Sequence, residues 1–315
     1  MNLSDYDANY IGKKAQELGF IRDTLEKVIR LADILTYFNT NPLLKGSLAL
    51  KGGTAINLTL FNLPRLSVDL DLDYLKADNR EEMLRNRGTI NSVIDRYMVS
   101  QGYVKIPKSK TPHSLDSWVY TYTNAGGNPD NIKLEINYSL RAHVLPVKER
   151  SIITEHFSSD NKVKALDPIE IYGSKINALL SRAAARDLYD VVNMITGRLF
   201  GESDEKMLRK CVVFYAAIST KTINKTFDTK AMDSITKHKI KTELLPVMRK
   251  RDYFDLDAAK KTVKEYMSSL MVLTKEETEF LEQFEKGKYL PELLFHNQDI
   301  LDRIQNHPMA IWKTR

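Results

Sequence analysis

Helical segments of this chain are visible in the spacing of its apolar side chains. Apolar residues recur at intervals near three and four over residues 11–40, and residues 80–101 also read as helical. This is the period of a helix that buries one face. A third run extends from Ile169 to about Ile195, preceded by a proline and followed by a glycine, which favour a helix start and a helix end. After Gly201 strand signals stop, so the second half is expected to be helical.

Strands are predicted where apolar and polar residues alternate. A short apolar run, Ser47–Leu50, leads into two glycines, and Ser67–Tyr74 alternates strictly. Trp118–Thr123 and Ile132–Leu140 alternate as well, and the turn sequence AGGNPDN between them predicts a hairpin. The expected fold class is therefore α+β, with a mixed N-terminal sheet flanked by helices and an all-helical C-terminal half.

Composition excludes several classes of protein. The chain has 315 residues, of which 43% are hydrophobic and 28% charged, as in globular domains. No run approaches the roughly 20 apolar residues of a membrane span. The N-terminal residues lack the features of a signal peptide, and the single cysteine, Cys211, has no partner for a disulfide, so a cytoplasmic protein is expected. The net charge of +6 favours a polyanionic partner.

The strand Ser67–Tyr74 carries three aspartates on one face. Asp69, Asp71 and Asp73 are each separated by a leucine, and side chains two residues apart on a strand point to the same side. Carboxylates about 7 Å apart repel one another, whereas a divalent cation between two of them turns repulsion into binding. A solvated edge strand with acidic residues facing water would show the same pattern.

Two glycines at the preceding strand-to-helix turn change this balance. Gly52 and Gly53 leave backbone N–H groups bare at a helix N-terminus, where a phosphate can bind. A phosphate-binding turn followed by a metal-binding carboxylate pair is the arrangement that nucleotidyl transfer needs. One part holds the triphosphate, and the other neutralises it and activates the attacking hydroxyl.

These residues resemble a known signature. The chain carries Lys51-Gly52-Gly53-Thr54 and then Arg65-x-Ser67-x-Asp69-Leu70-Asp71, which is similar to the signature of AbiEii/AbiGii-type nucleotidyltransferase toxins of the DNA polymerase β-like superfamily. The resemblance implies a nucleotidyltransferase-like sheet, an NTP substrate, Mg²⁺ or Mn²⁺ on the first two aspartates, and a functional serine before them. Thr54 replaces the usual serine and keeps a hydroxyl. The nucleotide-binding set so implied is Gly52, Gly53, Thr54, Arg65 and Ser67.

The third predicted helix adds a basic stripe. At 100° per residue, Lys175, Arg182 and Arg186 lie within about 40° of one another, which indicates either an anion site or a solvated basic surface. The resemblance matches Lys175 to a lysine that contacts nucleotide phosphates, with the two arginines counted as further nucleotide ligands. It matches the segment beginning at Arg186 to an R-D-x-x-D-like motif, whose functional acid is Asp187 or Asp190. Arg186 could instead pair with Asp190 for structure alone.

A third carboxylate is expected on a neighbouring strand. Glu135 shares a predicted face with Lys133 and is a candidate metal ligand or general base. An exposed charge paired with that lysine is the alternative reading. Asp73 competes for the same role, although it is the aspartate expected to tolerate replacement best.

Together these features predict a Mg²⁺-dependent nucleotidyltransferase toxin. The resemblance implies transfer of a nucleoside monophosphate to RNA, at the tRNA 3′ end, which would block translation. It also implies a cognate antitoxin from the same operon and a role in abortive infection as phage defence. A core domain over residues 1–165 and a helical domain over 166–315, contributing Lys175 to the cleft, are expected.

The acceptor is the less defined part of this prediction. Residues 221–251 hold nine Lys or Arg and three acids, which would suit an RNA backbone but also a solvated helix surface. Transfer to a protein hydroxyl or a small molecule is one alternative. A module that binds a nucleotide or RNA without turnover is another.

Overall fold

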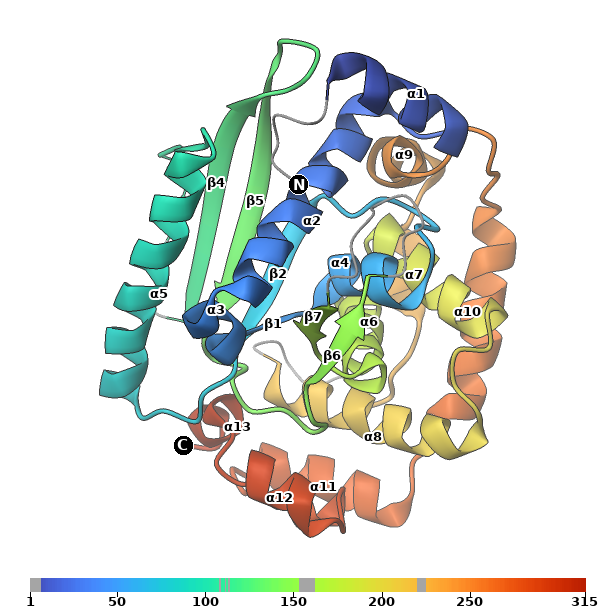
Figure 1. Ribbon diagram of the computed structural model, residues 1–315. Helices are drawn as coiled ribbons and strands as arrows, with labels where there is room; N and C mark the ends of the chain where they lie inside the picture. Colours follow the sequence, from blue (N-terminus) through green and yellow to red (C-terminus); the bar gives the residue numbers. More distant parts are fainter. Residues whose placement is uncertain (1–6, 108, 111, 113, 153–161, 220–224) are drawn as a thin grey trace. The chain divides into compact units, whose positions relative to one another are not determined.

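The computed structural model describes residues 7–107, 109–110, 112, 114–152, 162–219 and 225–315 (Figure 1). Lys221, in the basic stretch of residues 221–251, lies outside these residues. The chain divides into two compact units. The first consists of Met1–Arg141, Val147–Leu166 and Val247–Arg251, and the second consists of Ala142–Pro146, Asp167–Pro246 and Asp252–Arg315.

A mixed sheet forms the centre of the first unit. Within the described residues it has seven strands in the order β3-β4-β5-β2-β1-β7-β6. Their bounds are β1 Leu48–Leu50, β2 Asp69–Tyr74, β3 Val104–Lys105, β4 Leu115–Thr123, β5 Pro129–Asn137, β6 Lys148–Ser151 and β7 Lys162–Ala165. Strand β2 runs antiparallel to β1 and parallel to β5, so the aspartate strand is internal and not at an edge. The predicted hairpin is confirmed as β4 and β5.

Six helical elements accompany this sheet in the described part of the first unit. They are α1 Ala8–Leu18, α2 Arg22–Thr40, α3 Pro42–Ser47, α4 Gly52–Ala55, the π-helical turn η2 Ile56–Leu60 and α5 Arg80–Ser100. Helix α5 is tied to β4 by the ion pair of Arg87 with Asp116, and α2 lies against the same face because Arg30 stacks on the ring of Tyr122 (Figure 1). These contacts leave the opposite face for the aspartates, since side chains alternate along each strand.

The predicted helix over residues 11–40 is in fact two helices. Gly19 follows α1 with a φ of +76°, a left-handed conformation that ends a helix and that glycine adopts without strain. Its backbone N–H donates to the carbonyl oxygens of Ala15 and Gln16. The apolar period continues across this break because each of the two helices buries an apolar face, so the spacing of apolar residues alone does not reveal it.

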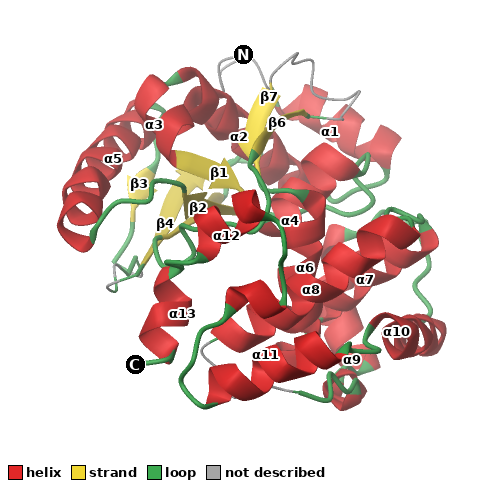
Figure 2. Cartoon of the chain, turned by 90° about the horizontal axis from the view of Figure 1, so that it is seen from below, coloured by secondary structure: helices red, strands yellow, loops and turns green. Residues whose placement is uncertain are grey.

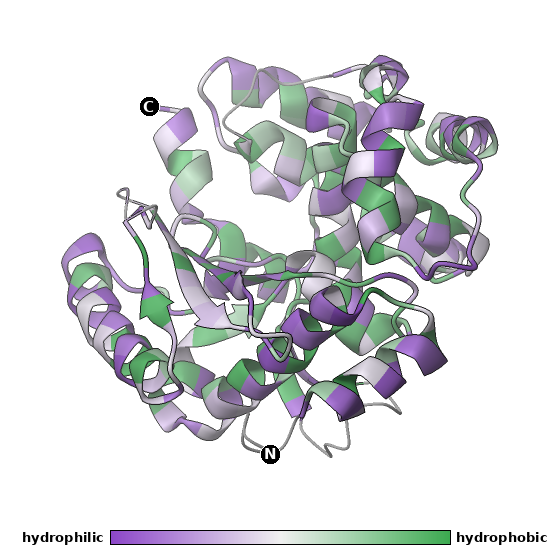
Figure 3. Ribbon diagram, turned by 90° about the horizontal axis from the view of Figure 1, so that it is seen from above, coloured by the Kyte–Doolittle hydropathy of each residue, from purple (hydrophilic) through white to green (hydrophobic). Residues whose placement is uncertain are grey.

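The second unit consists of helices within the part of the chain described, as expected (Figure 2). Most of them show hydrophilic and hydrophobic sides (Figure 3). Their bounds are α6 Pro168–Arg182, α7 Ala185–Thr196, α8 Glu202–Ile218, η3 Lys230–Ser234, α9 Lys237–Lys239, η4 Ile240–Leu244, η5 Leu245–Val247, α10 Leu256–Leu270, α11 Lys275–Glu285, η6 Pro291–Leu293, α12 Gln298–Ile304 and α13 Pro308–Lys313.

The prediction of one helix from Ile169 to Ile195 is wrong at its middle. Helix α6 ends at Arg182 because Ala183 adopts a left-handed conformation, with φ 48° and ψ 56°, and α7 begins two residues later. No glycine, asparagine or proline marks this break, so the sequence carries no local signal for it.

The α+β class, with its sheet first and helices after it, is confirmed. None of the helices in the described residues has the length and apolar character needed to cross a membrane.

Candidate functional site

The turn at Gly52 and Gly53 requires a glycine at its first position. Its φ is +67°, and a Cβ at this position would lie 2.6 Å from Oδ2 of Asp71. The backbone N–H of Lys51 donates to the carbonyl oxygen of Asp71 at 3.0 Å, which fixes the turn against β2. The first predicted phosphate-binding glycine and the second predicted metal-binding aspartate therefore lie in direct contact.

The second glycine makes a similar close approach. A Cβ on Gly53 would lie 2.9 Å from Nη2 of Arg65 and 2.9 Å from Oγ of Ser67. The carbonyl oxygen of Gly53 accepts a hydrogen bond from the buried side chain of Asn57 at 2.7 Å. Two side chains of the predicted nucleotide site thus converge on one glycine, and Asn57 joins them as a residue that the sequence did not reveal.

Thr54 and Arg65 have structural partners in this turn. The hydroxyl of Thr54 donates to the carbonyl oxygen of Asp69, and the Arg65 guanidinium donates to the carbonyl oxygen of Leu66 at 2.8 Å. Both side chains are buried, with 1% and 2% of their surface exposed. Thr54 thus joins the turn to β2, whereas Arg65 bonds to the backbone of its own segment, and a direct contact of either with a nucleotide stays a prediction.

Four carboxylates share the open face of two neighbouring strands. The parallel register places Asp69 beside Lys133, Asp71 beside Glu135 and Asp73 beside Asn137. Registered residues of adjacent strands lie about 5 Å apart and point to the same side. Glu135 therefore lies next to the predicted metal pair, and Asp69, Asp71 and Glu135 are half-buried rather than fully enclosed.

Asp73 differs from the other acids of this face. Its side chain is 1% exposed, and its carboxylate pairs with the ammonium of Lys51 at 2.5 Å. Lys51 precedes the glycine turn, so this pair also joins the turn to β2. Asp73 is thus a buried, ion-paired acid, which counts against the expectation that it tolerates replacement best, because its loss should lower stability.

Glu135 has two donors on one oxygen. Lys133 pairs with its Oε1 at 2.9 Å, and the hydroxyl of Ser117 on β4 donates to the same atom at 2.7 Å. Partial burial alone would raise the pKa of Glu135, but these hydrogen bonds outweigh it and the pKa is lowered. Glu135 is therefore ionised at neutral pH, as a metal ligand must be.

The donor chemistry of this face fits Mg²⁺. Among the described residues no three His, Cys, Asp or Glu side chains converge to form a metal site of protein ligands alone. Mg²⁺ does not need one, since it is commonly held by one or two carboxylates together with substrate phosphates and water. Asp69 and Asp71 would supply the carboxylates, and the contact of Asp71 with Gly52 brings that carboxylate next to the predicted phosphate turn.

Most of the predicted residues of the second unit form a charge network. The ammonium of Lys175 lies 3.0 Å from Oδ1 of Asp187 and 3.1 Å from Oδ2 of Asp190. Both aspartates are 1% exposed and Lys175 is 9% exposed. Arg182, which is largely exposed, donates from Nε to Oδ2 of Asp187 at 2.7 Å. The two candidate acids thus share one lysine.

The helix break at Ala183 brings residues of α6 and α7 together in this network, and it shows that the predicted stripe of Lys175, Arg182 and Arg186 on one helix is wrong. Lys175 and Arg182 belong to α6, whereas Asp187, Asp190 and Arg186 belong to α7, so the angle calculated for one continuous helix does not apply. Asp190 pairs with Lys175. Burial raises the pKa of Asp187, but Lys175 and Arg182 outweigh it and the pKa is lowered.

Some cations of the basic stretch have partners within the protein, and others are exposed to solvent. Lys225 pairs with Glu285. Arg249 belongs to the first unit and donates there to the carbonyl oxygens of Asn62 and Leu63. Lys237 and Lys241 are exposed. A further group is exposed or partly exposed, namely Lys230, Lys239, Lys250 and Arg251.

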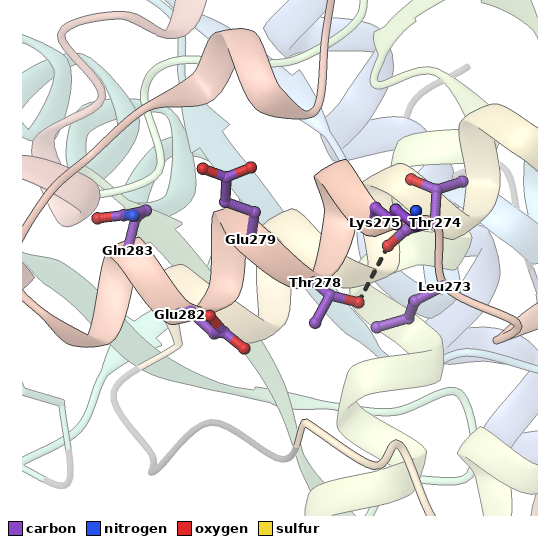
Figure 4. Close-up of a pocket in the computed structure, with 7 residues that line it drawn as sticks. All are labelled: Leu273, Thr274, Lys275, Thr278, Glu279, Glu282 and Gln283. Atoms are coloured by element: carbon purple, nitrogen blue, oxygen red, sulfur yellow. Dashed lines mark hydrogen bonds between the residues drawn. The ribbon is translucent and has the colours of Figure 1, made fainter.

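Two hollows on the described surface are lined by none of the predicted catalytic, nucleotide-binding or metal-binding residues. One of about 440 Å³ is formed by α11 and the residues before it (Figure 4). Its lining is Leu273, Thr274, Lys275, Thr278, Glu279, Glu282 and Gln283. It carries three acids or amides and one lysine, which gives it no evident preference for a phosphate.

Comparisons with known proteins bear on the whole chain. A search of curated proteins gave no match. A solved structure, the nucleotidyltransferase toxin MenT4 from Mycobacterium tuberculosis H37Rv, is similar in fold, with a TM-score of 0.62, 15% sequence identity, and coverage of 96% of this chain and 98% of that one. A family model described as "Nucleotidyl transferase AbiEii toxin, Type IV TA system" matches residues 33–259. The glycine turn, the aspartate strand and the Lys175 network all lie within that match, and the chain belongs to the AbiEii nucleotidyltransferase toxin family.

Proposed function

We propose that this toxin transfers a nucleoside monophosphate from an NTP to an RNA hydroxyl, at the 3′ end of tRNA. Charged tRNA would no longer form, and translation would stop in the cytoplasm until a cognate antitoxin acts. The observation that carries the proposal is the contact between the phosphate-type turn and the acidic face, where Gly52 admits the carboxylate of Asp71.

Asp69 and Asp71 would hold the divalent cation. Bound there with substrate phosphates, Mg²⁺ would offset the negative charge that builds up around the reacting phosphorus. The half-buried position of both aspartates leaves them accessible to a hydrated ion. Ser67 lies against Gly53 and would hold a phosphate oxygen together with the backbone N–H groups of the turn.

The reaction requires one bond to form and one to break. The acceptor oxygen bonds to the α-phosphorus of the NTP, the bond to the bridging oxygen breaks, and diphosphate leaves. The acceptor hydroxyl gives up its proton, and Glu135 is proposed to receive it because its lowered pKa keeps it ionised beside Asp71 on the neighbouring strand.

Lys175 is proposed to contact the phosphates of the nucleotide. Its ammonium is held between Asp187 and Asp190, so its position and its charge are set before a ligand arrives. Asp187 and Asp190 act on the ligand through this lysine, and Arg182 and Arg186 are proposed as weaker contributors. Lys237 and Lys241, which are exposed, are proposed to meet the RNA backbone.

The test is transfer of label to RNA. The pure protein is incubated with each α-labelled NTP, Mg²⁺ and total tRNA, and the RNA is separated and counted. Asp69→Ala and Asp71→Asn should abolish transfer, whereas Asp95→Asn on α5, which removes a partly exposed carboxylate paired with Lys105, should leave it intact. Equal label in RNA from the wild type and Asp69→Ala would rule out this function.

A further inference from the structure

Lys133 is a cation placed on the acidic face itself. It stands in register with Asp69 on the neighbouring strand, and it pairs with Glu135 two residues along its own strand at 2.9 Å. Residues two apart on a strand are separated by about 6.6 Å, so the lysine side chain must extend along the face to make this contact. Its ammonium therefore lies among the carboxylates that are proposed to bind the metal.

Electrostatics agree with that position. Burial alone would lower the pKa of Lys133, but Glu135 and then Asp69 and Asp71 outweigh it, so the pKa is raised. The three carboxylates thus hold one shared positive charge. Lys133 is 42% exposed, compared with 26% for Glu135, which leaves the ammonium a path into water.

We propose that Lys133 is a tethered counter-ion that a divalent cation displaces from the acidic face. The lysine neutralises part of the repulsion between Asp69, Asp71 and Glu135 when no metal is bound. A metal ion entering the face competes with the ammonium for the same oxygens. When the ammonium turns out to solvent, Oε1 of Glu135 loses one of its two donors and becomes available.

The lysine therefore sets the metal affinity of the site. This inference rests on the proposed metal role of Asp69 and Asp71, and it adds a residue that is not a ligand. Because the pair is partly exposed and screened by water, we expect removal of the charge to tighten metal binding by about three- to tenfold.

The test measures binding of Mn²⁺ alone to the full chain, from the electron paramagnetic resonance signal of the free ion. Lys133→Met removes the charge and keeps the length of the side chain, and Lys133→Arg keeps the charge. Ser117→Ala is the matched control, since it removes the other, neutral donor to the same oxygen of Glu135. Circular dichroism confirms folding of each variant, and Lys133→Gln replaces Lys133→Met if the latter does not fold.

We expect Lys133→Met to bind Mn²⁺ three- to tenfold more tightly than the wild type, with Lys133→Arg and Ser117→Ala within about twofold of it. Unchanged or weaker binding by Lys133→Met, or equal tightening by Ser117→Ala, overturns the inference and leaves the proposed function standing. The wild type is also compared with Asp71→Asn. Equal Mn²⁺ binding by these two proteins would overturn the proposed metal site itself, and the inference with it.

Discussion

The contact between Gly52 and Asp71 can be tested with a pair of glycine replacements. Gly52→Ala introduces a Cβ at a φ of +67°, 2.6 Å from Oδ2 of Asp71. Gly127→Ala, in the turn of the β4–β5 hairpin, introduces the same group at a φ of +81° with no atom within 4 Å. The first variant combines backbone strain with a collision, and the second carries strain alone.

The expected magnitudes separate the two effects. A non-glycine residue in the left-handed region costs about 1–2 kcal/mol, so Gly127→Ala should lower the free energy of unfolding by that amount. The collision at Gly52 adds about 1–3 kcal/mol because Asp71 or the turn must shift. A shift of a reacting group by about 1 Å lowers turnover by about a hundredfold, so Gly52→Ala should lose transfer activity while Gly127→Ala retains it.

Urea unfolding and the tRNA labelling assay measure these two quantities. The difference in unfolding free energy between the variants isolates the contact with Asp71, because the strain is common to both. Equal destabilisation of the two variants, together with undiminished labelling by Gly52→Ala, would refute the idea that this glycine is required by the carboxylate.

Three further outcomes are expected. Lys51→Met removes the ammonium partner of buried Asp73 and should lower the free energy of unfolding by about 3 kcal/mol, with part of it restored by adding Asp73→Asn; full stability of the single variant in urea would contradict the pairing. Gly173→Ala places a Cβ 2.7 Å from Cβ of Cys211, where α6 meets α8, and should cost about 1–3 kcal/mol, whereas Gly88→Ala on α5, with no atom within 4 Å, should stabilise slightly in the same thermal melt. Burial opposes ionisation of Asp187, but Lys175 and Arg182 outweigh it and lower its pKa, so its contribution to stability is present above about pH 4 and is lost as pH falls. The unfolding free energy of Asp187→Asn should therefore change less between pH 5 and pH 3 than that of the wild type. Equal changes in the two proteins, to within ~0.5 kcal/mol, would contradict this.

The sequence predicts most strands of this fold because alternation is a direct record of burial. Ser67–Tyr74 alternates, and the structure has β2 over Asp69–Tyr74 with its leucines inside. Helix breaks are harder to predict. Gly19 gives a usable signal, since a glycine inside a helical period often ends the helix. Ala183 gives none, because alanine is the best helix former and nothing in the local sequence marks its left-handed conformation.

The candidate site shows the same limit. Spacing places Asp69 and Asp71 on one face, and the resemblance selects them from three aspartates. Spacing does not show that Asp73 is buried against Lys51, because that pair joins residues on different elements. It also does not show that Gly52 touches Asp71, since the closeness depends on how the turn packs against β2. Contacts of this kind follow from tertiary packing and not from local periodicity.

The ion pairs of the two units explain how their charged groups stay ionised without a ligand. Burial by itself would favour the neutral carboxyl in Asp187 and in Glu135, yet the pKa of each is lowered because a lysine lies beside it. The energy of placing these charges is therefore supplied during folding. Under the proposed roles, a nucleotide or metal that binds there would find groups already charged and oriented, which is the condition under which fixed charges stabilise a transition state most effectively. The same pairs would limit affinity, since each ligand would have to compete with a charge that the protein already holds.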